Sequence, residues 1–351
     1  MKKKILVAPL NWGIGHATRC IPIVKWLIES DFEPIIASDG AALLLLKKEF
    51  SKLNCITFPA YNIKYQKSGK QLKLKLLRQL PQIAKTLKAE RIIIKKIIED
   101  YDISGVISDS RFGIYSKKIP SVIITHQLNV LSGNTSFISS IINKIQLKNF
   151  KEIWIPDFKE APNLSGKLGH ISEKSKLSIK YLGPLSRLNK TEMETKYDIM
   201  VLLSGPEPQR NLLEHKLIKE LHYYEGSVLF VKGIIENKQT KSTTGNLTIY
   251  NYMTSKAIEK AINSSKLIIC RSGYTTVMDL TKLGKKAFFI PTPGQFEQEY
   301  LAERLSNLHL APFCNQEHFN ATQLKRIIQF KGLDMQYNTP DLEVLFSLFL
   351  K

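Results

Sequence analysis

Residues 267–305 read LIICRSGYTTVMDLTKLGKKAFFIPTPGQFEQEYLAERL, and this stretch decides the fold. An apolar run over Leu267–Cys270 is followed by a polar loop and a segment with helical spacing, and the same order repeats over Ala287–Leu305. Strands that alternate with helices predict a parallel sheet covered by helices, because parallel strands need a crossover connection. Ligands bind such sheets at the carboxyl ends of the strands, where Arg271, Ser272 and Gly273 stand.

The same alternation extends through most of the 351 residues. Further apolar runs lie at Ile5–Ala8, Pro34–Ala37, Gly105–Ser108, Ser121–Thr125, Glu152–Ile155, Asp198–Leu203 and Ser227–Val231. A chain of this length is long for one hydrophobic core and sufficient for two. Gly183, Pro184 and the polar run to Lys196 predict the hinge. We therefore expect an α/β protein with two Rossmann-like, doubly wound parallel-sheet domains facing across a cleft: residues 1–183, a hinge at 184–196, and residues 197–335.

Polar residues behind the first loop of the quoted stretch suit a nucleoside diphosphate. Thr275 and Thr276 offer hydroxyls and backbone N–H groups at a helix start, where the helix dipole favours anions. Asp279, one or two turns further along, has the chemistry to accept hydrogen bonds from both hydroxyls of a ribose. The simpler alternative for Asp279 is an ion pair with Lys282 on a solvated helix face.

The second loop of the stretch, Pro291–Gln295, opens a helix that carries Glu297 and Gln298. A carboxylate beside an amide suits the vicinal hydroxyls of a sugar, because each group can bridge two oxygens. Negative charge at the start of a helix is also common, so Glu297 alone does not identify a sugar-binding site.

A glycine-spaced loop, NWGIGHATRCIP at residues 11–22, follows the first apolar run. Gly13 and Gly15 let the backbone turn sharply and approach a ligand. A dinucleotide fingerprint is incomplete, since Thr18 stands at the third glycine position. His16 lies at the loop-to-helix junction, and a neutral imidazole can take a proton from a hydroxyl at physiological pH. Taken alone, His16 is more simply explained as a capping or solvated histidine.

Together these residues resemble GT-B glycosyltransferases, especially the family 28 type N-acetylglucosaminyltransferases of peptidoglycan precursor synthesis. The pattern R-S-G-x-x-T-x-x-E of that family is similar to Arg271–Asp279, with Asp in place of Glu. Its P-x-x-x-[DQ]-Q-x-x-N-A pattern is met by Glu297, Gln298 and Ala302, while Leu301 stands where Asn is usual.

The first half of the chain resembles the family more weakly. Gly13–His16 is similar to the end of the family's glycine loop, with fewer glycines. The THQLN stretch at residues 125–129 resembles the family's His-Glu-Gln-Asn stretch loosely. In GT-B proteins the C-terminal tail typically crosses back to the first domain, so the final helix predicted within residues 336–351 is expected to do the same.

The resemblance implies an inverting, metal-independent hexosyltransferase without a cofactor. It implies a nucleotide-diphosphate sugar as donor, UDP-sugar first, and an acceptor hydroxyl on a glycan or on a lipid-linked molecule of the cell envelope. His16 is then the candidate catalytic base and Asp279 the ribose-binding residue. The residues expected to bind the diphosphate are Ser204, Gly205, Arg271, Ser272, Gly273, Thr275 and Thr276. Those expected to bind the sugar are Gln295, Glu297 and Gln298. Gly13 and Gly15 form the glycine loop. The prolines after Gly205 make that phosphate loop stiffer and remove donors.

The charge balance, 51 Lys+Arg against 31 Asp+Glu, gives a formal net charge of +20 and favours anionic partners. Residues 61–101 are rich in lysine, with Leu and Ile at helical spacing and Pro81 dividing the segment in two. One interpretation is a pair of covering helices with solvated lysines; the other is a basic amphipathic face on anionic lipid. Nucleic acid is not expected, because aromatic residues do not interleave the basic ones.

The remaining features point to the cell interior. The four cysteines lie far apart without a metal-ligand spacing, which predicts reduced thiols. The N-terminal apolar run ends too early, at Asn11–Gly13, for a signal peptide, and no apolar stretch reaches membrane-spanning length. We expect a cytoplasmic protein that is peripheral on the inner face of the membrane.

Two other functions stay open from the sequence. A nucleotide-sugar epimerase shares the architecture and uses buried carboxylates, for which Asp109 and Glu207 are candidates. A basic nucleic-acid-binding protein is the alternative from a different class, and strongly salt-dependent binding to a duplex or single strand would identify it. A NAD(P) dehydrogenase is disfavoured by the incomplete fingerprint.

Overall fold

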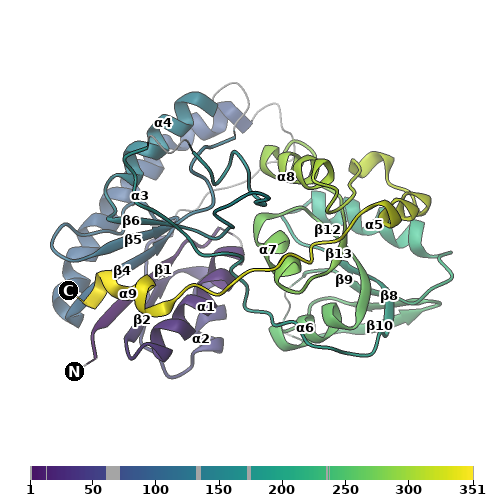
Figure 1. Ribbon diagram of the computed structural model, residues 1–351, viewed down its shortest axis with the longest axis horizontal. Helices are drawn as coiled ribbons and strands as arrows, with labels where there is room; N and C mark the ends of the chain where they lie inside the picture. Colours follow the sequence, from purple (N-terminus) through teal and green to yellow (C-terminus); the bar gives the residue numbers. More distant parts are fainter. Residues whose placement is uncertain are drawn as a thin grey trace. The chain divides into compact units, whose positions relative to one another are not determined.

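The computed structural model describes residues 2–12, 14–60, 72–131, 136–171, 175–234, 236 and 238–350, without the side chains of 72–83, 137 and 138. The chain forms two compact units. The first unit comprises the described residues up to Arg187 together with those from Tyr337 onward, and the second unit is Leu188–Gln336. Each unit is an α/β structure on a largely parallel sheet, so the predicted fold class of two parallel-sheet domains is confirmed (Figure 1).

In the part of the chain that the structure describes, the first unit has a seven-stranded sheet in the order β3-β2-β1-β4-β5-β6-β7. All its strand pairs are parallel. The strands are β1 (Lys4–Pro9), β2 (Glu33–Ser38), β3 (Cys55–Thr57), β4 (Ile103–Asp109), β5 (Ser121–Ile124), β6 (Glu152–Ile155) and β7 (Ile179–Tyr181). The strand order reverses between β1 and β4, which is where open α/β sheets bind ligands.

Helices cover both faces of this sheet because alternate residues of each strand point to opposite sides. Ile5 and Val7 of β1 pack on the face with α1 (Gly15–Glu29) and α9 (Leu342–Leu350). Leu6 and Ala8 pack on the other face with α3 (Leu72–Tyr101). The further helices are α2 (Gly40–Glu49), which packs with α1, and α4 (Ser136–Leu147), which covers β5 and β6 on the α3 side.

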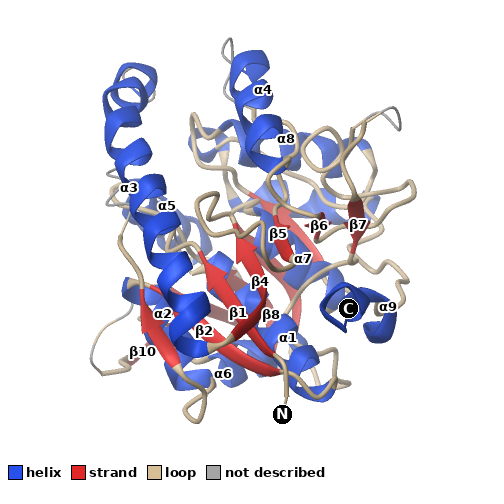
Figure 2. Cartoon of the chain, turned by 90° about the vertical axis from the view of Figure 1, so that its left-hand side faces the viewer, coloured by secondary structure: helices blue, strands red, loops and turns tan. Residues whose placement is uncertain are grey.

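Helix α3 runs continuously through Pro81, where a break was predicted. The prediction was wrong because a prolyl ring holds φ near the helical value, so one hydrogen bond is lost without reversing the chain. The 30 residues of α3 span about 45 Å, whereas the seven residues of β4 span about 23 Å. Since α3 ends where β4 begins, its first half extends beyond the carboxyl edge of the sheet (Figure 2).

Helix α9 completes the core of the first unit. Phe346 and Phe349 are buried with Trp154 and Phe32, and their rings lie about 6 Å apart at inclined angles. A Cβ on Gly105 of β4 would lie only 2.3 Å from Cδ1 of Phe349, so glycine is needed for this close packing.

The second unit carries, among the residues described, a six-stranded sheet in the order β10-β11-β9-β8-β12-β13, with β10 the antiparallel strand. Its strands are β8 (Tyr197–Leu202), β9 (Val228–Val231), β10 (Lys241–Thr244), β11 (Leu247–Tyr250), β12 (Ser265–Cys270) and β13 (Lys286–Phe289). Its helices are α5 (Gln209–Leu221), α6 (Ser255–Asn263), α7 (Tyr274–Lys282), α8 (Phe296–Asn307) and two 3-10 segments, η3 (Gln316–His318) and η4 (Ala321–Gln329). The strand order reverses between β8 and β12.

Within the described ranges, no helix combines the length and the apolar character needed to cross a membrane.

Candidate functional site

Polar side chains meet at the carboxyl edge of the first sheet, where the strand order reverses. His16 and Arg19 lie near the start of α1, Asp109 ends β4, and His126 follows β5. Arg19 Nε lies 2.5 Å from Asp109 Oδ2, and Arg19 Nη2 donates to Oδ1 of the same carboxylate. Both side chains are buried, and this two-point ion pair is what makes burial of the two charges tolerable.

The imidazole of His16 is held against this ion pair. Its Nδ1 lies 2.9 Å from Asp109 Oδ1 and 2.8 Å from Arg19 Nη2, and the side chain is 13% exposed. Burial and the Arg19 charge lower the pKa of His16 below 6.5, against the opposing effect of Asp109. Burial by itself would raise the pKa of Asp109, but Arg19 and His16 hold it well below its usual range. At pH 7 the pair is therefore a neutral imidazole beside a carboxylate anion.

A second histidine contacts the same guanidinium. His126 Nδ1 lies 3.0 Å from Arg19 Nη1, and the two imidazole ring centres are 6.4 Å apart. Cys20 Sγ lies 3.6 Å from Asp109 Oδ2, and burial raises the pKa of this thiol well above its usual value. Cys20 is consequently an unreactive packing residue here.

A buried ion network supports the loop that precedes α1. Arg111 pairs with Asp39 and, at 2.7 Å, with Glu90. Asn11 donates from Nδ2 to Asp39 at 3.0 Å, and its Oδ1 accepts the backbone N–H of Ala42 at the start of α2. Gly13 lies outside the described residues, and Gly15 is the first residue of α1.

In the second unit, the open N-terminus of α7 lies at the end of β12. Gly273 is its N-cap residue and makes no side-chain capping hydrogen bond. A Cβ on Gly273 would meet only Thr276 Oγ1, at 3.9 Å, so there is room beside this helix start. Thr275, Thr276 and Asp279 are half-buried along α7. Backbone N–H groups and the helix dipole make such a terminus suited to an anionic group.

Arg271 and Ser272 point into the protein, which differs from the expectation that they contact a diphosphate. Arg271 is 1% exposed, and burial lowers its pKa to about 10, so it stays charged at pH 7. Its guanidinium donates to four protein acceptors, the carbonyls of Gln209, Ile290 and Pro291 and Oε1 of Gln316. Ser272 Oγ donates to the carbonyl of Gln298 at 2.7 Å. Both side chains therefore hold loops together at this edge of the sheet.

The N-terminus of α5, where Ser204 and Gly205 were expected to bind phosphate, contacts a carboxylate of the chain itself. Glu207 Oε2 accepts the N–H of Asn211 at 3.2 Å, and Glu207 Oε1 pairs with Arg210 at 2.5 Å. Ser204 and Gly205 are exposed, and Gly205 has a φ of +108° that favours glycine. A phosphate at this terminus would have to displace Glu207.

The three residues expected to bind the sugar differ in exposure. Gln295 is exposed as the N-cap residue of α8, and Glu297 is half-buried. Gln298 is 8% exposed, and its Oε1 accepts the N–H of Thr292 at 2.8 Å. Gln298 therefore shapes the Pro291–Gln295 loop, whereas Gln295 and Glu297 stand at the surface.

Sequence reasoning missed Arg19 and gave Asp109 only to the epimerase alternative. Arg19 follows His16 by three residues, a spacing that brings helical side chains together, so this pair could have been found. Asp109 ends an apolar run that pairs with the run before His16, which is a weaker signal. No sequence motif indicates the buried network of Arg111, Asp39 and Glu90.

A pocket of about 320 Å³ lies against α4 in the first unit. It is lined by Asn129, Val130, Leu131, Ser136, Ser140, Ile141, Lys144 and Lys167. Asn129 Nδ2 donates to the carbonyl of Lys167 at 2.7 Å, which fixes the loop that follows His126. Lys144 and Lys167 contribute positive charge to its lining. Among the described residues, no three or more His, Cys, Asp or Glu side chains are grouped to hold a metal ion.

Comparisons with known proteins find similarity to glycosyltransferases. Residues 209–336 match the model of the glycosyltransferase family 28 C-terminal domain. The chain is 26% identical to the UDP-N-acetylglucosamine--N-acetylmuramyl-(pentapeptide) pyrophosphoryl-undecaprenol N-acetylglucosamine transferase of Haemophilus ducreyi, over 94% of this chain and 90% of that enzyme. It is 23% identical to an uncharacterized glycosyltransferase of Methanosarcina acetivorans, over 84% and 81% of the two chains.

Solved structures show the same fold. The crystal structure of Acinetobacter baumannii MurG matches with a TM-score of 0.60 at 15% identity, covering 100% of this chain and 99% of that one. The glycotransferase of kitacinnamycin matches with a TM-score of 0.65 at 11% identity, covering 93% and 90%.

Proposed function

We propose that this chain, a glycosyltransferase of the GT-B fold whose second unit carries a family 28 C-terminal domain, transfers a sugar from a nucleotide-diphosphate donor with inversion and without a metal ion. The proposal rests mainly on the His16–Asp109 pair, in which a neutral imidazole meets an ionised carboxylate at 2.9 Å. This is the arrangement that a general base needs near neutral pH.

In this reaction Asp109 accepts the Nδ1–H of His16, which leaves the lone pair on Nε2. Nε2 takes the proton of the acceptor hydroxyl while the hydroxyl oxygen forms a bond to the anomeric carbon of the sugar. The bond from that carbon to the diphosphate breaks, and the nucleoside diphosphate leaves with the electron pair. A single displacement of this kind inverts the anomeric configuration.

The second unit supplies the donor site in this proposal. The open N-terminus of α7, with Thr275 and Thr276, stabilises the charge that develops on the departing diphosphate, because backbone N–H groups and the helix dipole do so without a cation. Asp279 binds the ribose hydroxyls, and Gln295 and Glu297 bind the sugar. UDP is the expected nucleotide, since the Haemophilus ducreyi relative is named for a UDP-sugar donor.

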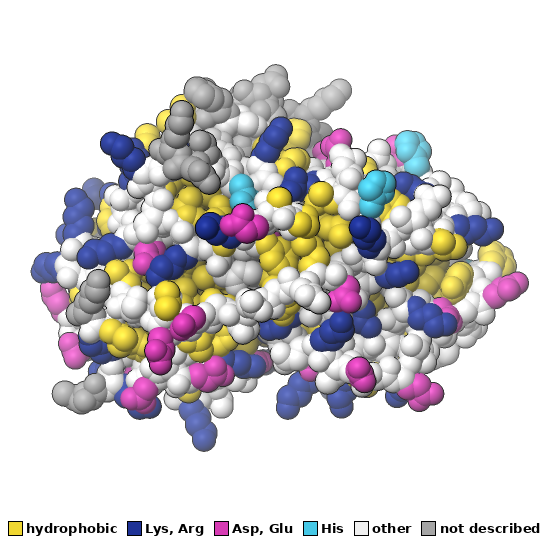
Figure 3. All heavy atoms as spheres, viewed as in Figure 1, with side chains coloured by type: hydrophobic (Ala, Val, Ile, Leu, Met, Phe, Trp, Pro, Cys, Tyr) yellow, Lys and Arg dark blue, Asp and Glu magenta, His cyan; other side chains and the backbone are white. Residues whose placement is uncertain are grey.

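A lipid-linked, anionic acceptor fits the first unit. The relatives' names specify a pyrophosphoryl-undecaprenol acceptor, and the pocket beside α4 holds Lys144 and Lys167. Ile142 and Ile145 of α4 are 55% and 56% exposed, which suits contact with a membrane. We therefore place the enzyme in the cytoplasm, peripheral on the inner face of the membrane. Figure 3 shows Lys and Arg side chains together with Asp and Glu side chains on the face in view, so the positive charge is not gathered into one patch there.

The test is a thermal-shift screen of the full chain against UDP, GDP, dTDP, CDP and ADP, with and without EDTA. A ligand at a hundred times its dissociation constant adds about 2.7 kcal/mol of stability. We expect one diphosphate to raise the melting temperature, EDTA to leave the shift unchanged, and Asp279→Ala to abolish it.

Asp334→Ala is the matched control, because Asp334 lies in the same unit and pairs with Lys190 in an exposed position. It should leave the shift intact. No shift with any diphosphate contradicts the donor site, and loss of the shift in EDTA contradicts metal independence. Conversion of the UDP-sugar without an acceptor would indicate an epimerase instead.

A further inference from the structure

One guanidinium contacts two histidines of the first unit, His16 and His126, in each case at the ring atom Nδ1. We propose that Arg19 is a positioning residue that sets the protonation of both rings, leaving Nε2 of His16 as the base and Nε2–H of His126 as a hydrogen-bond donor. This inference rests on the proposed function, because the base acts on the acceptor hydroxyl. It adds Arg19 and His126 to the acceptor side of the reaction.

The state of His126 follows from the chemistry of arginine. A guanidinium has only donors, so the ring nitrogen that lies 3.0 Å from Arg19 Nη1 must present its lone pair. A doubly protonated ring would set two donors against each other. His126 is therefore neutral, with its proton on Nε2.

Which ring nitrogen of His16 carries the proton depends on which of two neighbours its Nδ1 bonds. Nδ1 lies 2.8 Å from the donor Arg19 Nη2 and 2.9 Å from the acceptor Asp109 Oδ1. Protonation of Nδ1 toward Asp109 leaves a base at Nε2, whereas acceptance from Arg19 moves the proton to Nε2 and removes the base. Arg19 Nη2 directs one of its two hydrogen atoms to Asp109 Oδ1, and the other can reach Nδ1. The negative charge of the carboxylate makes the Nδ1–H to Asp109 bond the stronger of the two alternatives, so Nδ1–H is favoured.

Arg19 also keeps the His16 ring from taking a second proton. The charged and titratable groups facing His16 are Arg19 of α1, Asp109 at the end of β4 and His126 after β5. An unpaired Asp109 anion would hold His16 as a cation, which has no lone pair to accept a proton. The Arg19 charge offsets that attraction.

The two rings then have opposite hydrogen-bonding roles at neighbouring positions. Their centres are 6.4 Å apart and their planes are inclined by 49°. One ring accepts a proton and the other donates a hydrogen bond, so the pair suits an acceptor with the reacting hydroxyl next to a second oxygen. A sugar with vicinal hydroxyls has that chemistry.

The experiment records long-range ¹H–¹⁵N spectra of the full chain with ¹⁵N-labelled histidine, between about pH 5 and pH 8. Signals are assigned with His16→Gln and His126→Gln. We expect His126 as the Nε2–H tautomer and His16 as the Nδ1–H tautomer, with His16 titrating below 6.5. Protonation of His126 on Nδ1, or a cationic His16 at pH 7, overturns the proposal. These spectra need no substrate and no variant of Arg19.

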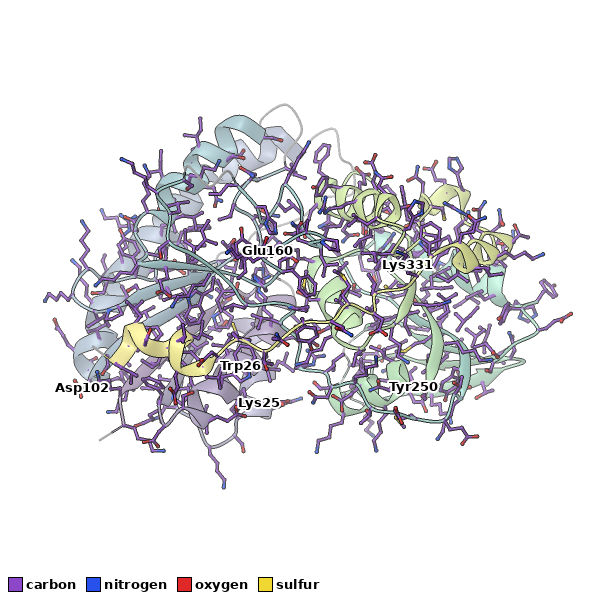
Figure 4. The ribbon with its side chains drawn as sticks, in the orientation of Figure 1. Lys25, Trp26, Asp102, Glu160, Tyr250 and Lys331 are labelled. Carbon is purple, nitrogen blue, oxygen red and sulfur yellow. The ribbon has the colours of Figure 1, made fainter. Side chains whose placement is uncertain are left out.

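Variants then separate positioning from stability. In Arg19→Gln the titration of His16 should move to higher pH, and transfer should fall about 10²-fold. Arg19→Lys keeps the charge but loses the planar fork, so it should retain the low titration of His16 and lose the fixed tautomer of His126. Lys25→Gln is the matched control: Lys25 lies further along α1, and its side chain is 48% exposed (Figure 4). In this variant the titration of His16 and the tautomers of both histidines should be as in the parent.

If Arg19→Gln does not fold, the tautomers of His16 and His126 in the parent protein decide whether the proposal holds. If it folds and His16 titrates as before, Arg19 has no positioning role. The thermal-shift screen distinguishes this result from failure of the proposed function, because lack of nucleotide binding leaves the histidine spectra unchanged.

Discussion

At the scale of single residues, Asp109 is the group on which the first unit's polar cluster depends. Its carboxylate is fully buried and contacts Arg19, His16 and Cys20 at the same time. A carboxylate in that position is stable only while its counter-charge is present. The cluster around His16, the proposed base, is therefore also expected to contribute to folding.

Replacing Asp109 by Asn should lower the free energy of unfolding of the first unit by about 3–5 kcal/mol, because the Arg19 charge is left buried without a partner. Urea unfolding of the full chain, followed through Trp154 fluorescence, measures this loss. Asp100→Asn, at an exposed position of α3, is the control and should change stability by less than about 0.5 kcal/mol. Equal stability of the two variants would show that the ion pair is not holding this unit together.

The loss should depend on pH in one direction. The folded pKa of Asp109 lies below its unfolded value of about 3.9, so the ionised group stabilises the fold above that pH. Measured with His16→Gln in both proteins, so that the His16 ring does not titrate, the stability difference made by Asp109→Asn should be constant from about pH 5 to pH 8 and decrease as the pH falls below about 3.9. A difference that grows on acidification would contradict the ion-pair explanation.

At the scale of elements, α3 and α4 cover the same face of the first sheet and differ in what they expose. Lys88, Ile92 and Lys95 of α3 are exposed and recur at the spacing of one helix face. Helix α4 adds the exposed apolar residues Ile142 and Ile145. The part of residues 61–101 before Leu72 lies outside the described residues. Within residues 61–101, the lipid-binding hypothesis therefore rests on α3 alone.

The parent protein should bind vesicles of phosphatidylcholine and phosphatidylglycerol at low salt more tightly than vesicles of phosphatidylcholine alone. Lys88→Gln with Lys95→Gln should weaken binding to the anionic vesicles by about 2 kcal/mol, or roughly 30-fold, since each basic residue near the surface contributes about 1 kcal/mol. Cosedimentation measures both. Leu44→Ser, at an exposed position of α2 on the other face, should have no effect. Equal binding to the two kinds of vesicle would exclude this role.

At the scale of the whole molecule, the two units have separate hydrophobic cores. Ile5, Val24 and Phe349 belong to one core of the first unit, and Phe230 and Phe288 belong to that of the second. Separate cores allow separate unfolding, because each sheet buries its own apolar residues.

Calorimetry of the full chain should therefore show two unfolding transitions. The nucleoside diphosphate identified by the screen should raise only the transition of the second unit, because the proposed donor residues all lie there. Asp279→Ala should remove that increase and leave the other transition in place. A nucleotide that raises the transition of the first unit would contradict the assignment of the donor site.

Sequence patterns predicted more of the fold than of the site. Alternating apolar runs at Ile5–Ala8 and Leu267–Cys270 predicted two parallel-sheet α/β units, and the structure confirms them, because burial on both faces of a sheet leaves a direct pattern in the chain. The resemblance to family 28 type GT-B glycosyltransferases is also confirmed, since residues 209–336 match the family's C-terminal domain. The roles of the proposed site residues stay predictions.

The sequence alone indicated most of the central strands and the helices that follow them, since hydrophobic period and turn residues act locally, although it predicted a break in α3 that the structure does not have. It also located the motifs at Gly15-His16 and Arg271–Asp279 near strand ends. Only the tertiary structure decided where the side chains point. Arg271 lies inward on backbone carbonyls, and Arg19, beside His16, contacts Asp109 and His126, which lie 90 and 107 residues further along the chain. Such contacts depend on which strand ends become neighbours in the sheet, and no local pattern encodes that.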